Sequence, residues 1–149
     1  MKNYIINEDT YAIIAIGSNK SIIYEKNNRF IVNSRPNRII KRNCYYNGST
    51  FEGRMNATKY LTGYTYKTPI LIKEEGNIIF FPTKSSRLED CSWISLNNIF
   101  NYCKTTNKYI SRIIFQNKIY IELPLTYNIL NNQILRSMNL ESKLRKKCL

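Results

Sequence analysis

Short apolar runs separated by polar turn residues make up the first third of the chain. Isoleucine-rich segments alternate with the breaks Gly17–Asn19 and Asn27–Asn28. Apolar runs of this length, bounded by glycine and asparagine, are typical of β-strands. We therefore predict three strands here, at residues 11–16, 21–25 and 29–32.

Two short helices are predicted near residues 35–61, where the pattern changes. Ser34 can cap a helix that enters through Pro36, because proline suits the first helical turn. Ser49 and Glu52 have the S-x-x-E spacing of a capping box, which predicts the start of a second helix.

The β pattern returns after residue 63. Two hairpins are predicted, with turns at Glu74–Gly76 and Gln116–Asn117. Together with a buried-strand pattern between them, they give five further strands, at residues 69–73, 77–81, 91–95, 109–115 and 118–123.

A C-terminal helix is predicted from Thr126, with Leu130, Ile134 and Met138 at four-residue steps on one face. No repeat or linker divides the sequence. We therefore expect one α+β domain over residues 1–149, built from short antiparallel strands and hairpins, two short helices near 35–61 and the C-terminal helix.

The net charge of the chain limits the possible functions more than any other property of the sequence. Lys and Arg number 23 against 10 Asp and Glu, which gives a net charge of +13. An A+T-rich codon bias explains the many Asn, Ile, Lys and Tyr residues, but not the shortage of acids, whose codons are nearly as rich in A and T. Such an excess destabilises a chain by self-repulsion and indicates a polyanionic partner, with nucleic acid favoured over an anionic membrane.

Composition also disfavours several kinds of site. The chain has no histidine, so the commonest acid–base and triad chemistries lack their central residue. The four cysteines form no C-x-x-C pair and are expected to be structural thiols, with Cys148 exposed near the C-terminus. We expect no metal and no cofactor. Without a signal peptide or an apolar run of membrane-spanning length, the protein is expected in the cytoplasm, with no membrane partner.

The cations gather in three clusters. Residues 29–59 hold seven cations and one acid, residues 104–118 hold four cations and no acid, and residues 136–147 hold five cations and one acid. The cations of residues 104–118 could simply point into solvent from a hairpin. Those of residues 136–147 could offset the dipole at the C-terminal end of a helix. The first spans a strand and two predicted helices, and is the strongest candidate for a phosphate-binding surface.

Aromatic residues are interleaved with this first cluster. Tyr45, Tyr46 and Phe51 could stack on the bases of a single strand, but we expect them in the core, because aromatics supply much of the burial in a small domain. Trp93 is expected in the core or at a dimer contact. The outer edge of segment 44–63, rich in hydroxyls and cations, suits phosphate groups.

Four blocks of sequence resemble a known family. CYYNGSTFEGR (44–54), FPTKSS (81–86), CSWIS (91–95) and IELPLTYN…NNQILR (121–136) are similar to blocks of the ComK competence transcription factors of low-G+C Gram-positive bacteria, in the same order and spacing. The resemblance covers roughly residues 20–145. Family members continue past KLRKKCL, so the chain is expected to be a short member that lacks the usual C-terminal extension.

The resemblance implies an activator of DNA-uptake genes that binds A·T-rich promoter DNA, chiefly through the minor groove. It implies a homodimer or a dimer of dimers, a location at the nucleoid, and RNA polymerase and a Clp-protease adaptor as further partners. The narrow groove of A-tracts has an enhanced negative potential that attracts Arg and Lys, which is consistent with the charge of this chain.

Nine residues are candidate DNA contacts. Arg54 ranks first, because it lies in a resembling block beside Gly53, which would let the backbone approach a phosphate; its replacement by Ala is expected to weaken DNA binding without lowering the melting temperature. The hydroxyls of Ser49 and Thr50 are candidate phosphate ligands, although Ser49 also suits the helix cap. The other candidates are Lys41, Arg42, Lys59, Lys84, Arg87 and Arg136.

Some alternatives stay open. Asn132 and Gln133 could read A·T base edges or hydrogen-bond within the domain. The chain could be a non-activating DNA- or RNA-binding module, such as a truncated paralogue that antagonises a full-length activator. A small nuclease is disfavoured: Glu141 and Lys143 have an E-x-K spacing, but lie on a predicted helix far from Asp90, the nearest upstream Asp. We expect no enzymatic activity.

Overall fold

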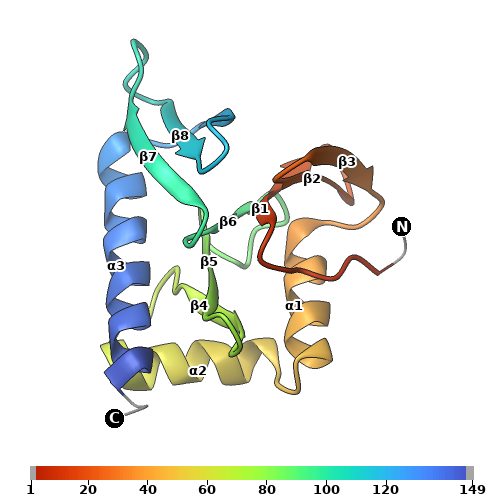
Figure 1. Cartoon of the computed structure of the whole chain (residues 1–149), viewed down its shortest axis with the longest axis vertical. Helices are drawn as coiled ribbons and strands as arrows, with labels where there is room; N and C mark the ends of the chain where they lie inside the picture. Colours follow the sequence, from red (N-terminus) through yellow and green to blue (C-terminus); the bar gives the residue numbers. More distant parts are fainter. Residues whose placement is uncertain (1–2, 147–149) are drawn as a thin grey trace.

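The computed structural model describes residues 3–146, which form two antiparallel sheets and three helices (Figure 1). The predicted α+β class, with antiparallel strands and a C-terminal helix, is confirmed. All eight predicted strands are present, with ends displaced by at most two residues.

The larger sheet has six strands in the spatial order β3-β2-β1-β6-β5-β4. The pairing of β1 with β6, which places Ile13 opposite Trp93, joins an N-terminal meander to one formed later in the chain. The strands are β1 (Thr10–Ile16), β2 (Lys20–Glu25), β3 (Asn28–Val32), β4 (Ile70–Lys73), β5 (Ile78–Pro82) and β6 (Trp93–Ser95).

The middle of this sheet is buried on both faces. Phe80 and Trp93 pack with residues of the first two helices, whereas their neighbours Phe81 and Ile94 pack with residues of the smaller sheet and the C-terminal helix. Successive residues of a strand point to opposite faces. The continuous apolar runs in the sequence therefore reflect a sheet covered on both sides.

The smaller sheet contains β7 (Ile99–Lys104), β8 (Ser111–Phe115) and β9 (Tyr120–Leu123), in that order. Strand β7 was not among the sequence predictions. It lies at an edge and its residues are exposed or half-buried, so its sequence IFNYCK has no continuous apolar run. Its pairing with β8 forms the hairpin at the upper left of Figure 1.

The helices are α1 (Pro36–Tyr46), α2 (Phe51–Thr62) and α3 (Tyr127–Lys146). In Figure 1, α2 lies crosswise between one end of α1 and the C-terminal end of α3, and it contacts both helices. The two short helices predicted near 35–61 are thus present, but their caps differ from the prediction.

Both cap predictions on serine are wrong. The residue before α1 is Arg35, whose side chain makes no capping hydrogen bond, while Ser34 is buried and its carbonyl accepts a hydrogen bond from Ser21 Oγ at 2.7 Å. At α2 the cap is Thr50, whose Oγ1 accepts from the Gly53 amide at 2.8 Å. The Ser49 amide instead donates to the carbonyl of Cys44 at the end of α1.

Predicted burial was only partly right. Trp93 is fully buried, as expected, and Phe51 packs partly against the core. Tyr45 and Tyr46, however, are 65% and 68% exposed, because α1 turns Ile39, Ile40, Asn43 and Cys44 inward.

The buried face of α3 also differs from the prediction. Leu130 and Ile134 are buried, but Met138 is 52% exposed. Steps of four residues rotate by about 40° too much on a helix of 3.6 residues per turn. The buried face therefore continues through Ser137 and Leu140. Cys148 lies outside the described residues.

Candidate nucleic-acid interface

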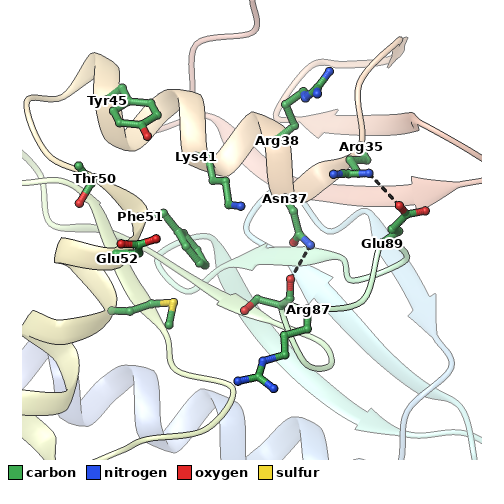
Figure 2. A pocket seen from close by; sticks show the side chains of 12 residues that line it. Arg35, Asn37, Arg38, Lys41, Tyr45, Thr50, Phe51, Glu52, Arg87 and Glu89 are labelled. Atoms are coloured by element: carbon green, nitrogen blue, oxygen red, sulfur yellow. Dashed lines mark hydrogen bonds and ion pairs between the residues drawn. The ribbon is translucent and has the colours of Figure 1, made fainter.

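A hollow of about 780 Å³ lies between α1, the start of α2 and the loop that connects β5 to β6. We call it the α1–α2 groove (Figure 2). It takes residues from three separate parts of the chain, and they are Arg35, Asn37, Arg38, Lys41, Tyr45, Thr50, Phe51, Glu52, Met55, Ser86, Arg87 and Glu89.

The side chain of Asn37 holds the wall of the groove together. Its Nδ2 donates to the carbonyls of Ser86 at 2.8 Å and Leu88 at 3.0 Å, and its Oδ1 accepts from Trp93 Nε1 at 2.8 Å. One amide thus ties α1, the β5–β6 loop and the buried tryptophan together. The loop is fixed against α1 before any ligand is bound.

Three cations of the groove have no acidic partner within residues 3–146. Figure 2 shows Arg38 and Lys41 on α1 and Arg87 on the facing loop, and all three are exposed. Arg35 is different, because its Nη1 lies 3.0 Å from Glu89 Oε1 in an ion pair. The remaining acid of the lining, Glu52, lies in the first turn of α2, where a negative charge suits the helix dipole.

The groove also has aromatic surface. Phe51 packs edge-on against Trp93, with ring centroids 5.9 Å apart, and Lys41 Nζ lies 5.7 Å from the Phe51 centroid. Tyr45 borders the groove one helical turn further along α1. The lining of the groove therefore combines four cations and two acids with the apolar surface of Phe51 and Met55.

The groove brings together Lys41, Thr50 and Arg87 of the nine predicted contacts. Thr50 has a structural role as well, because its Oγ1 caps α2. Arg42, Ser49 and Lys59 do not line the groove.

Lys84 and Arg136 are engaged within the protein. Lys84 Nζ lies 2.8 Å from Asp90 Oδ2, and this hydrogen bond lowers the pKa of Asp90. Arg136 donates to the Tyr66 carbonyl at 2.6 Å and to Gln133 Oε1 at 3.1 Å, and it lies over the Tyr64 ring. Burial lowers the pKa of Arg136, although the guanidinium stays charged.

Gln133 resolves one alternative that the sequence left open. It is 1% exposed, and its Nε2 donates to the carbonyls of Pro82 at 2.7 Å and Lys67 at 3.0 Å. Gln133 therefore hydrogen-bonds within the protein. Asn132 is exposed, so its role stays a prediction.

Arg54, the first-ranked candidate, is largely buried. Its side chain is 12% exposed and lies 3.8 Å from Glu74 in an ion pair, and its Nε has no hydrogen-bond partner among the described residues. Gly53 has a local role, since a Cβ there would lie 2.9 Å from Thr50 Oγ1. The expectation that Arg54 could be replaced without loss of stability does not agree with this burial.

Sequence reasoning missed Asn37 and Arg38 as site residues. A usable signal for Arg38 was present, because Arg38, Lys41 and Tyr45 follow the i, i+3, i+7 spacing of one helical face. The role of Asn37 depends on contacts with residues about fifty positions away, which no local pattern contains.

Within residues 3–146, no group of three potential metal ligands occurs. Cys44 and Cys91 are buried free thiols, and burial raises the pKa of each to about 11. Glu141 of the E-x-K segment lies on α3, near Arg145 at 3.8 Å and Asn97 at 3.3 Å. No helix of the described chain is long and apolar enough to cross a bilayer.

Comparison with known families agrees with the resemblance of the four sequence blocks. The family model of the ComK protein matches residues 1–148. The chain belongs to the ComK family. Among its relatives, the competence transcription factor of Bacillus subtilis (strain 168) is 34% identical over 146 residues, covering 96% of the chain and 76% of the relative. No solved structure matches significantly. Transcription regulation is the function class that membership of the ComK family supports.

Proposed function

We propose that this ComK-family chain is a competence transcription factor that binds A·T-rich promoter DNA, largely through the minor groove and the backbone phosphates, with the α1–α2 groove as its interface. The observation that carries the proposal is a set of three cations without an acidic partner among the described residues, Arg38, Lys41 and Arg87, around a groove whose loop is already fixed by Asn37. In this proposal the protein activates DNA-uptake genes and has no enzymatic activity.

Electrostatics supports duplex DNA as the ligand. Each cation that neutralises a phosphate releases condensed counterions, which is the main source of affinity for DNA. An A-tract has a narrow minor groove with enhanced negative potential, so cations are drawn there preferentially. Because A·T and T·A pairs look alike from the minor groove, this mode selects A·T-rich DNA rather than one exact sequence.

The assembly and location follow from the same proposal. Binding as a homodimer or dimer of dimers would multiply the phosphate contacts, as family resemblance suggests. Contacts with RNA polymerase and with a Clp-protease adaptor would belong to other surfaces. A protein that binds the chromosome in this way would be found in the cytoplasm, at the nucleoid.

The test is a comparison of three duplexes: an A·T-rich promoter fragment, a G·C-rich fragment, and the same G·C-rich fragment with inosine in place of guanine. An inosine–cytosine pair lacks the minor-groove amino group of guanine, so it resembles A·T in the minor groove but G·C in the major groove. We expect the A·T-rich and inosine duplexes to bind alike and the G·C-rich duplex more weakly. Inosine DNA that binds like G·C-rich DNA would contradict the minor-groove mode, and preference for single-stranded RNA would favour the RNA-binding alternative.

The groove itself is tested by Arg38→Ala/Arg87→Ala against the matched control Lys20→Ala/Lys26→Ala. Both pairs remove two exposed charges, but only the first pair lines the groove. Losing two phosphate contacts should weaken binding by on the order of tenfold or more at physiological salt. Equal losses in the two variants would mean that net charge, rather than the groove, determines affinity.

A further inference from the structure

The longest acid-free part of the sequence leads to a second surface. Residues 91–121 contain no Asp or Glu, but include Lys104, Lys108, Arg112 and Lys118. Arg112 is neutralised by the acid that follows this stretch, since its Nη2 lies 2.7 Å from Glu122 Oε2. Of the other three cations, Lys104 and Lys108 lie at or next to the tip of the β7–β8 hairpin, whereas Lys118 lies in the turn between β8 and β9.

The hairpin tip, residues 105–110, is ordered by its own hydrogen bonds. Thr105 Oγ1 lies 2.8 Å from the carbonyl oxygens of both Asn107 and Ile110, and its one proton can be donated to either. Asn107 Oδ1 accepts from the Tyr109 amide at 2.9 Å. Figure 1 shows the tip extending beyond the body of the molecule, at the end of α3 that is remote from α2. Because the tip is already ordered, it can enter a groove of DNA without a separate ordering step.

A second hollow, of about 440 Å³, lies between this tip and the first residues of α3. Unlike the α1–α2 groove, it has no acid in its lining and shares no residue with that groove. Lys104 Nζ lies 5.6 Å from the centroid of Tyr127, and Lys108 Nζ lies 5.2 Å from that of Tyr109. The other lining residues carry hydroxyls or amides, apart from Ile110.

We propose that the β7–β8 hairpin is a second DNA-contacting element, separate from the α1–α2 groove. Lys104 and Lys108 bind backbone phosphates on either side of the minor groove, and Thr106 and Asn107 at the tip face the base edges. The inference depends on the proposed function, and it names the part of the chain that enters the DNA groove.

The chemistry of the tip favours DNA over the other polyanionic surfaces. Lysines with adjacent hydroxyl and amide groups match phosphate oxygens and the acceptors on the floor of an A·T minor groove. Tyr109, 64% exposed, is the single large apolar side chain of residues 105–110 that is strongly exposed, so the tip has little apolar area for a membrane.

The experiment measures the affinity of the full chain for the A·T-rich duplex as a function of salt, for the wild type and for Lys104→Ala/Lys108→Ala. Affinity falls by about 0.9 logarithmic units per phosphate for each tenfold rise in salt. Loss of two phosphate contacts should therefore reduce the slope by about 1.8, and weaken binding by about 30-fold near 0.15 M salt. Both lysines are exposed, so the variant should keep the wild-type melting temperature.

The matched control is Lys143→Ala/Lys146→Ala, which removes two exposed lysines at the opposite end of α3. A smaller change in the control supports the hairpin contact, whereas equal changes overturn it. If the hairpin variant binds DNA with the wild-type affinity and salt slope, the proposed DNA contact is also overturned. This holds even if the variant no longer activates a promoter, because the surface would then serve a protein partner. If the wild type itself ignores A·T-rich DNA, the proposed function fails instead, so the two failures are distinguishable.

Discussion

At the residue scale, Arg54 differs from the exposed cations of the groove, because its side chain is only 12% exposed. Its stem packs beneath the surface, and its partner Glu74 lies at 3.8 Å, which is a long ion pair. Removing the aliphatic stem of Arg54 should leave a gap in the packing and lower the free energy of unfolding. Removing only the charge should change the free energy of unfolding little, because burying the guanidinium has already cost the protein the hydration of that charge.

We therefore expect Arg54→Ala to lower the free energy of unfolding by about 1–2 kcal/mol, or the melting temperature by roughly 3–6 °C. Arg54→Met, which keeps the stem, should retain the wild-type melting temperature. Thermal denaturation checks both, with Lys41→Ala as an exposed control. If Arg54→Ala melts like the wild type while both Arg54 variants lose DNA affinity, Arg54 is a DNA contact after all.

Sequence reasoning worked for residues whose environment follows from their type. Trp93 was expected in the core and lies there, because a large aromatic among short strands gains most from burial. Tyr45 was expected in the core but is exposed, and the burial of the Arg54 side chain was not foreseen, since both depend on which face of a helix meets the sheet. That choice is set by the whole packing arrangement.

At the element scale, the start of α2 depends on the hydroxyl of Thr50, which accepts from the Gly53 amide at 2.8 Å. Ser49 is one position too early to do this. We expect Thr50→Ala to reduce the free energy of unfolding by about 1 kcal/mol, and Ser49→Ala to change it by less than about 0.5 kcal/mol. Urea unfolding followed by circular dichroism measures both.

Thr50→Ser is the control for this cap, because serine keeps the accepting oxygen. It should remain within a few tenths of a kcal/mol of the wild type. Equal losses for the Ala variants at 49 and 50 would argue against a specific cap at Thr50.

Most elements could be predicted because their apolar pattern is local. The exception, β7, lies at an edge and gains its strand conformation from pairing with β8 rather than from its own composition. The β1–β6 pairing was equally inaccessible, since the two strands are separated by six other elements of the chain. A periodic pattern identifies a strand but does not identify its neighbour.

For the whole molecule, the net charge of +13 should affect folding and DNA binding in opposite directions as salt is added. Salt screens repulsion among the cations, which stabilises the compact state, and it weakens attraction to phosphates. We expect the free energy of unfolding in urea to rise with sodium chloride while affinity for DNA falls. A folding stability that decreases with salt would show that the acids already neutralise the cations locally.

The charge excess was predictable at this scale, but its location was not. The basic cluster of residues 29–59 looked like one surface in the sequence. In the structure, Arg38 and Lys41 reach the groove, whereas Arg54 is largely buried and Lys59 lies further along α2. The third wall of the groove comes from the β5–β6 loop, which folding brings to α1 through Asn37.

The contact between Asn37 and Trp93 has a consequence during synthesis. A ribosome that has made α1 and α2 has not yet made the indole that donates a hydrogen bond to Asn37 Oδ1, nor strand β6, which pairs with β1 in the middle of the larger sheet. The α1–α2 groove can therefore reach its final shape only after β6 has been synthesised. A nascent chain released before that point would carry the basic residues without the means of holding them in place.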